Sequence, residues 1–211
     1  CMFLSGLFCY LDGAIDYFQK AIDRGFWYSP AYITGDDDLE LLADNPRFNE
    51  LSEISAAGYE KFASELQSTL DVYPPTTNTD KAPLLLAIHG NISSAALSYK
   101  DWKVATDCGR LLAMPNSSHL FIKDGYLWAD FEKAELEIKA HYETLISQYD
   151  FEAEKTTIGG YITGANLAVW TMLNQLFPIK GFIVVGLFLR NQEEWVKRLD
   201  ALKGSNLRGY V

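Results

Sequence analysis

The sequence is poor in the features that identify several large classes of protein. Its three cysteines, Cys1, Cys9 and Cys108, match neither a metal site nor a disulfide framework in their spacing. The 18 Lys and Arg are outnumbered by 28 Asp and Glu and form no cluster, and the formal net charge is -10. A nucleic-acid surface needs a basic stripe that neutralises phosphates, so we exclude nucleic acid as a partner.

Long apolar runs are also lacking. No stretch reaches the roughly 18 residues that a membrane-spanning helix needs. The opening CMFLSGLFCYL is apolar but has neither the basic leader nor the cleavage site of a signal peptide, and we interpret it as a buried helix. With so few cysteines, this predicts a cytoplasmic protein. Both ends look cut, because the chain starts inside an apolar segment and stops in LRGYV, which has the pattern of a strand just beginning.

The composition and the periodicity of the sequence predict a globular chain of two parts. The chain is 48% hydrophobic and 14% aromatic, as in a globular protein. Residues 1–66 have helical periodicity and are expected to form a small helical segment. Gly25 and the Asn45-Pro46 pair are expected to end one helix and begin another. The second of these helices is expected to bury one apolar stripe, made of Phe48, Leu51, Ile54, Tyr59, Phe62 and Leu66.

Residues 67–211 alternate between strand and helix patterns. STLDVY alternates apolar and polar residues as an outer antiparallel strand does, whereas LLLAIHG is a continuous apolar run typical of a strand buried on both faces. Further strands are expected at 111–115, 155–161 and 181–186, with helices between them and a long amphipathic helix over 130–149. The predicted fold class is α/β, a mostly parallel sheet with helices on both faces, preceded by the helical segment and incomplete at its C-terminus.

Ligands of such sheets bind beyond the carboxyl ends of the strands, and one loop there has a distinctive pattern. Gly160-Tyr161-Ile162-Thr163-Gly164 has the flanking glycines, the preceding strand and the following helix of a nucleophile elbow, G-x-S-x-G, but isoleucine replaces the serine. The pattern predicts a strand over 156–161, a helix over 164–176 and a positive φ at Ile162. The glycine spacing does not fit a dinucleotide site, and no phosphate-binding loop or zinc motif is present, so we expect no cofactor and no metal.

A second loop is expected beside this turn. His89-Gly90-Asn91 follows the buried strand at the position where hydrolases carry an oxyanion-hole N–H, and the N–H of Thr163 would be the second donor. His89 is expected to orient the backbone and not to act as a base. His141, within a helix, is expected at the surface, and His119 follows a strand end, where a pocket role stays open.

Taken together, these segments resemble the α/β-hydrolases of the phospholipase/carboxylesterase and dienelactone-hydrolase type, in particular members with a TPR-like helical N-terminal segment. The resemblance is carried by AIDYFQKAIDRGFWYSP, DDDLELLADNPRFNEL, LLLAIHGN, MPNSS, DGYLWAD, IGGYITGANLAV and GFIVVG, in the family's order. It implies that Ile162 occupies the nucleophile position and that Asn91 and Thr163 occupy the oxyanion positions. The acid and histidine of the family would follow the strand that GYV begins, outside this sequence.

Three interpretations remain open. The chain is a hydrolase-like protein without ester hydrolysis that serves as a binding or scaffold module, or it is an active serine-type hydrolase whose catalytic set is unconventional or lies partly outside the chain. In the third, Ile162 is an ordinary residue in an ordinary turn. Ser93, Ser94 and Thr163 have no evident base and are expected to be cap or turn residues. The expected ligand is a small ester or carboxylate, and the helical N-terminal segment is a candidate for peptide or protein contact.

Overall fold

A computed structural model describes residues 11–77, 80–188 and 192–211. Its backbone contacts divide the chain into two compact units. Unit 1 comprises Cys1–Leu66 and Leu120–Gly125, and unit 2 comprises Gln67–His119 and Tyr126–Val211. The helix expected at the very start of the sequence lies outside the described residues, as do Cys1 and Cys9. Cys108 is a free, exposed thiol.

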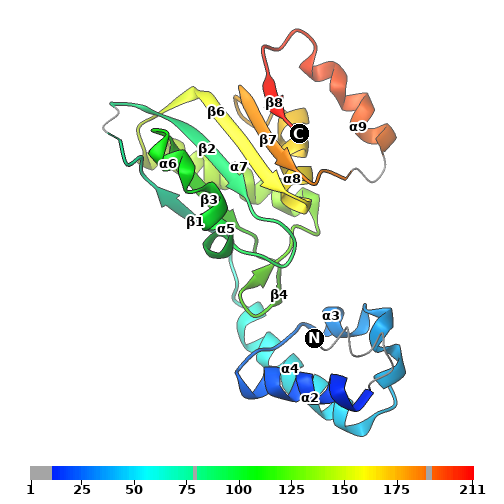
Figure 1. The fold of residues 1–211 in the computed structure, drawn as a ribbon. Helices are drawn as coiled ribbons and strands as arrows, with labels where there is room; N and C mark the ends of the chain where they lie inside the picture. The colour runs from blue at the N-terminus through cyan, green and yellow to red at the C-terminus, as the bar shows by residue number, and fades with distance from the viewer. Residues whose placement is uncertain (1–10, 78–79, 189–191) are drawn as a thin grey trace. The chain divides into compact units, whose positions relative to one another are not determined.

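Unit 1 is built mainly from α2 (Leu11–Asp23), α3 (Pro30–Thr34), the 3-10 helix η1 (Asp37–Leu42) and α4 (Pro46–Ala63) (Figure 1). The carboxamide of Asn45 accepts hydrogen bonds from the N–H groups of Arg47 and Phe48, so the predicted start of α4 is confirmed. Gly25 has φ 74°, as expected for the residue that ends α2. The hydrophobic core of unit 1 consists of Ala14, Phe18, Ile33, Leu39, Leu42, Phe48 and Leu51.

The expected apolar stripe of α4 is wrong beyond its first turns. Ile54 is 47% exposed and Phe62 51% exposed, while Ser55 is fully buried. The Ser55 hydroxyl accepts from the N–H of Tyr28 at 2.7 Å and donates to the Tyr28 carbonyl at 2.9 Å. Because this polar side chain satisfies both backbone groups of a neighbouring segment, it takes the inward position that the hydrophobic pattern assigned to Ile54.

A short hairpin, β4 (Leu120–Ile122) and β5 (Gly125–Tyr126), was not predicted. Within unit 1, Ile122 pairs with Tyr28, Ser29 donates to the Phe121 carbonyl at 2.9 Å, and Lys123 donates to the Trp27 carbonyl at 3.1 Å. The hairpin turns at Asp124, which has φ 59° and precedes Gly125. The Asp-Gly pair is a strong hairpin signal, so the sequence did contain an indication of this turn.

Unit 2 is a six-stranded sheet in the order β1-β3-β2-β6-β7-β8 (Figure 1). The strands are β1 (Thr69–Tyr73), β2 (Ala82–Ile88), β3 (Leu111–Asn116), β6 (Phe151–Tyr161), β7 (Gly181–Val185) and β8 (Arg208–Tyr210). Only β1 is antiparallel to its neighbour, as the alternating pattern of STLDVY predicts. The helices are α5 (Ala95–Trp102), α6 (Val104–Asp107), α7 (Phe131–Gln148), α8 (Thr163–Leu173), α9 (Gln192–Arg198) and the 3-10 helix η2 (Leu199–Leu202). The predicted α/β class is confirmed.

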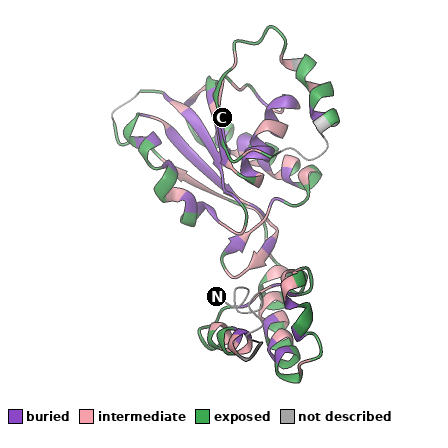
Figure 2. Cartoon of the chain, turned by 45° about the vertical axis from the view of Figure 1, so that its right-hand side comes forward, coloured by how far each residue is buried: buried purple, intermediate pink, exposed green. Residues whose placement is uncertain are grey.

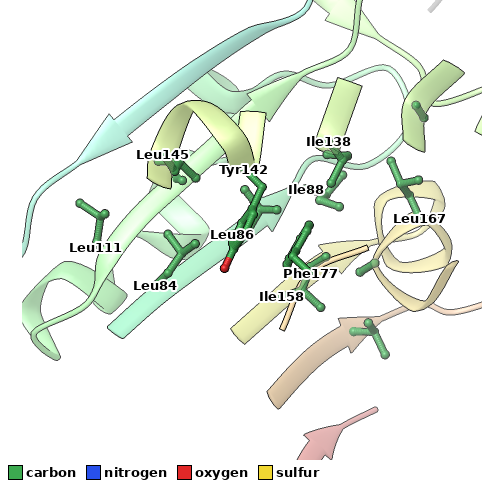
Figure 3. Close-up of a cluster of buried hydrophobic side chains, with 14 of the residues drawn as sticks. Leu84, Leu86, Ile88, Leu111, Ile138, Tyr142, Leu145, Ile158, Leu167 and Phe177 are labelled. Carbon is green, nitrogen blue, oxygen red and sulfur yellow. The ribbon is translucent and has the colours of Figure 1, made fainter. Parts of the chain in front are cut away.

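Side chains of β2 alternate between two cores. Leu84, Leu86 and Ile88 pack on one face with residues of α7 and α8, and Figure 3 shows this cluster. Leu85 and Ala87 pack on the other face with residues of α5 and α6. The strands β2 and β3 are buried along almost their whole length, and Figure 2 shows buried strands in the middle of the sheet, which explains the unbroken apolar run of β2 in the sequence. In the described part of the chain, no helix combines the length and apolarity needed to cross a bilayer.

Candidate functional site

The turn between β6 and α8 has the geometry of a nucleophile elbow. β6 ends at Tyr161 and α8 begins at Thr163, so Ile162 alone makes the connection. Its φ is 51° and its ψ is -111°, which confirms the positive φ expected for an elbow centre. For a β-branched residue this backbone conformation is a strained outlier.

The two flanking glycines are required by close backbone packing. A Cβ on Gly160 would lie 2.3 Å from the carbonyl oxygen of Gly164. A Cβ on Gly164 would lie 2.3 Å from the carbonyl oxygen of His89, at the end of β2. Any side chain at either position would push the turn away from the sheet, so the glycines explain why strand and helix meet so sharply.

Hydrogen bonds hold Ile162 in its strained conformation. Its N–H donates to the carbonyl of Val185 at 2.9 Å, and its carbonyl accepts from the N–H of Asn166 at 3.0 Å. Its side chain is hydrocarbon and 44% exposed. The elbow therefore presents a hydrocarbon group to solvent where a hydrolase presents an attacking oxygen.

His89 lies behind the elbow as a buried structural residue. It is 0% exposed. Its Nδ1 lies 2.8 Å from the Gly90 carbonyl, and its Nε2 accepts from the N–H of Ser117 at 3.4 Å. Burial lowers the pKa of its imidazole to about 4, against the opposing effect of the Gly90 hydrogen bond. Both ring nitrogens are engaged and the ring is neutral near pH 7, so it orients backbone and is not available as a base.

The expected oxyanion positions lie together. The Thr163 hydroxyl donates to the side-chain oxygen of Asn91, which joins the elbow to the loop after β2. A Cβ on Gly90 would lie 3.2 Å from the Tyr161 carbonyl, so these loops are in close contact. The N–H of Thr163 belongs to the first turn of α8, where no intrahelical acceptor exists. Among the described residues this N–H donates to no acceptor, and the helix dipole adds positive potential at this end of α8. The N–H of Thr163 can therefore donate a hydrogen bond to a carbonyl or carboxylate oxygen.

The neighbouring hydroxyls have structural partners. The Ser94 hydroxyl accepts from the N–H of Leu97 at 3.2 Å and caps α5, as expected. Ser93 Oγ lies 3.1 Å from Ser98 Oγ, and the Ser93 N–H and carbonyl both pair with Tyr126. Neither serine is hydrogen-bonded to a histidine or a carboxylate in the part of the chain that the structure describes. They do not form the nucleophile–base pair that acyl transfer requires.

The other two histidines lie apart from the elbow. The surface position expected for His141 is wrong: it is half-buried, and its Nε2 lies 2.6 Å from Ser68 Oγ, which itself donates to the Asn116 carbonyl. Burial lowers its pKa, against the effect of Glu137. The pKa of His119 is lowered by burial and by Lys133, against the effects of Glu137 and Asp130. His119 lines a space of about 20 Å³, enough for one water molecule.

No group of three or more His, Cys, Asp or Glu side chains suited to a metal ion occurs among residues 11–77, 80–188 and 192–211. The structure brings together the residues that were predicted for this site, namely Ile162, Thr163 and the segment from His89 to Asn91.

No pattern in the sequence indicated the role of Asn166. Its side chain is 5% exposed, forms hydrogen bonds with both backbone groups of Phe188 and fixes the loop after β7.

Comparison with known proteins supports the fold. Residues 4–63 match the family described as "A/B hydrolase-like, N-terminal domain". A solved structure of an uncharacterized protein from Bacillus cereus ATCC 10987 is 28% identical, with a TM-score of 0.59 over 100% of this chain and 67% of that chain. No curated protein matches the sequence.

Esterase structures are also similar to parts of the chain. An acetyl xylan esterase from Aspergillus awamori is 17% identical, with a TM-score of 0.46 over 56% of this chain and 46% of that one. Est1E from Butyrivibrio proteoclasticus, with ferulic acid bound, is 16% identical, with a TM-score of 0.47 over 57% and 49% of the two chains. The fold assignment rests on the N-terminal family match and the Bacillus cereus structure. The chain has an α/β-hydrolase-like fold with a small helical N-terminal part.

Proposed function

We propose that this α/β-hydrolase-like chain binds a small ester or carboxylate at the elbow without hydrolysing it. The observation that carries the proposal is Ile162, which has the backbone geometry of an elbow centre but an aliphatic side chain. A branched alkane has no lone pair with which to attack a carbonyl. The strained φ argues against an ordinary turn, because such a turn would relax to a conformation that isoleucine favours.

Loss of the nucleophile removes most of the catalytic advantage of a triad. What remains comes from oxyanion donors and binding. Those donors are backbone N–H groups of Thr163 and the loop at Asn91, and they do not depend on the side chain at position 162. The half-exposed hydrocarbon side chain of Ile162 favours a ligand with a short hydrocarbon part beside its carbonyl.

Finer assignments extend this proposal. The segment order and the elbow glycines favour a relationship to the phospholipase/carboxylesterase and dienelactone-hydrolase type. The packed pair α2 and α4, with Phe18 between aromatic neighbours Tyr28 and Phe48, supports a TPR-like interpretation of unit 1 and a role in peptide or protein contact. The low cysteine content supports a cytoplasmic location.

Hydrolysis of p-nitrophenyl acetate and butyrate tests the proposal. The unmutated chain is expected to show no burst of nitrophenol. Ile162→Ser is assayed beside it, and Ile162→Ala, which lacks a hydroxyl as isoleucine does, is the control for that variant. A burst from the unmutated chain that a serine-directed phosphonate abolishes would contradict the proposal. It would favour the second candidate interpretation, an active hydrolase with an unconventional catalytic set.

A further inference from the structure

Unit 1 contains a half-open cavity of about 450 Å³ between η1 and the first turns of α4. Its floor is formed by Ile33, Leu39 and Phe48, which are 7%, 2% and 5% exposed and belong to the hydrophobic core of unit 1. Hydrocarbon groups contribute more of the cavity surface than polar groups do. Because the floor is packed core, the cavity is preformed, and its volume lies in the range of small-molecule sites.

One wall of the cavity is a single row of side chains along η1. A 3-10 helix has three residues per turn, so side chains three residues apart lie above one another. Asp37, Glu40 and Ala43, which directly follows η1, form this row and line the cavity. Leu39 and Leu42, in another row of the same helix, are buried. Two carboxylates therefore lie next to each other at the edge of an apolar floor.

These two carboxylates lack a partner of opposite charge. The side chains of Asp37 and Glu40 form no hydrogen bond or ion pair with any described residue. No Lys, Arg or His is among the described residues that line the cavity. Like charges three residues apart on a helix repel each other, so a cation bound between them would relieve the repulsion.

The other polar side chains of the lining already have partners. Asp36 accepts a hydrogen bond from the Asp38 N–H at 3.0 Å and caps η1. The side chains of Thr34, Asn49 and Ser52 each donate to a backbone carbonyl, at 3.0, 3.1 and 2.8 Å. The polar groups left for a ligand are therefore anionic acceptors.

We propose that this cavity binds a small organic cation, a primary amine carried on a hydrocarbon body. The hydrocarbon covers the floor, and the three N–H groups of the ammonium donate to the carboxylates of Asp37 and Glu40. An uncharged molecule of the same shape leaves the carboxylates unpaired, and an anionic one is repelled by them. The site lies within unit 1, so it is independent of the ester or carboxylate binding proposed for the elbow in unit 2.

Calorimetric titration of the full chain with octylammonium tests the inference. We expect one saturable site. 1-Octanol lacks the charge and ethylammonium lacks most of the hydrocarbon, so each is expected to compete at least about tenfold more weakly than octylammonium itself. Octanoate, a candidate ligand of the elbow, is expected not to compete with octylammonium.

Glu40→Gln separates cation binding from a structural role. It removes one of two repelling charges, so it is expected to keep or raise the Tm while it weakens octylammonium binding about threefold. A folding failure therefore cannot mimic the result. Glu60→Gln makes the same change at an exposed position of α4, about two turns beyond the cavity lining, and is expected to leave the affinity unchanged.

Ser52→Trp fills the cavity and is expected to abolish the binding. Ile54→Trp is its control, because residues two apart in a helix point to opposite sides and Ile54 is 47% exposed. The absence of saturable octylammonium binding, unchanged binding in Ser52→Trp, competition by octanoate or equal weakening in Glu40→Gln and Glu60→Gln would each overturn the inference. Equal weakening would show attraction to the net charge of the chain alone.

Discussion

At the residue scale, Ile162 keeps an unfavourable backbone conformation although its side chain has no group that could take part in a reaction. The bonds to Val185 and Asn166 and the packing of Gly160 and Gly164 impose the turn. The sequence predicted this conformation because glycine spacing encodes the close approach of backbone segments. It did not predict that His141 is half-buried, because the partner hydroxyl, Ser68, is distant in sequence and its approach depends on tertiary packing.

Replacement of Ile162 by glycine should stabilise the protein. The positive φ costs isoleucine on the order of 1–3 kcal/mol, and the half-exposed side chain contributes little burial in return. We expect Ile162→Gly to raise the free energy of unfolding by about 1 kcal/mol in urea denaturation. Ile183→Gly, at a comparably exposed position in β7, should lower it, because glycine weakens a strand. A loss of stability in Ile162→Gly equal to that in the control would show that the turn is unstrained.

Stability should decrease as the pH falls from 6.5 towards 4. The pKa of His89 is about 4 in the folded chain, below its value of 6.5 in the unfolded chain, so the unfolded state binds more protons over this interval. The same direction holds for His119 and His141. From the His89 shift alone we expect a loss of about 3 kcal/mol. Urea denaturation at several pH values measures it, and His89→Gln should flatten the dependence. A stability independent of pH between 6.5 and 5 in the unmutated chain would contradict the buried neutral imidazole.

At the element scale, regular periodicity made most helices and strands predictable. The strand β2 and the long helix α7 follow their hydrophobic patterns, because β2 is buried on both faces and α7 buries one stripe over many residues. The strand β1 is only partly buried, and its alternating pattern was enough to predict it. The hairpin of β4 and β5 was missed because its strands are too short to show a period. Ser55 was missed because a serine that satisfies two backbone groups is indistinguishable in sequence from an exposed one.

Gly164→Ala should disrupt the junction of β6, α8 and β2. The new Cβ would lie 2.3 Å from the His89 carbonyl oxygen, a backbone atom that cannot move without shifting the sheet. We expect a loss of about 3 kcal/mol in the free energy of unfolding. Gly181→Ala is the control, because its Cβ would meet the Thr157 hydroxyl at 3.2 Å and no nearer atom. Similar stability of the two variants would contradict the tight packing of the elbow.

At the scale of the whole molecule, the alternation of strands and helices made the α/β class predictable. The grouping of Leu120–Gly125 with the helical residues before Leu66 was not, because it depends on backbone pairing between segments about 90 residues apart, as between Tyr28 and Ile122. The proposed function also belongs to this scale. Carbonyl binding at the elbow requires the end of β2 and the start of α8 to be held together by the sheet.

The most direct test is an NMR titration of the ¹⁵N-labelled chain with ethyl butyrate. The ester carbonyl is expected to shift the amide signal of Thr163 saturably, while butanol, which lacks the carbonyl, leaves it unchanged. The proton spectrum of the same sample follows the ester itself, and its signals should persist without release of ethanol. Protein-dependent appearance of ethanol and butyrate, or an unshifted Thr163 amide at the solubility limit of the ester, would contradict a site that binds carbonyls without hydrolysing them.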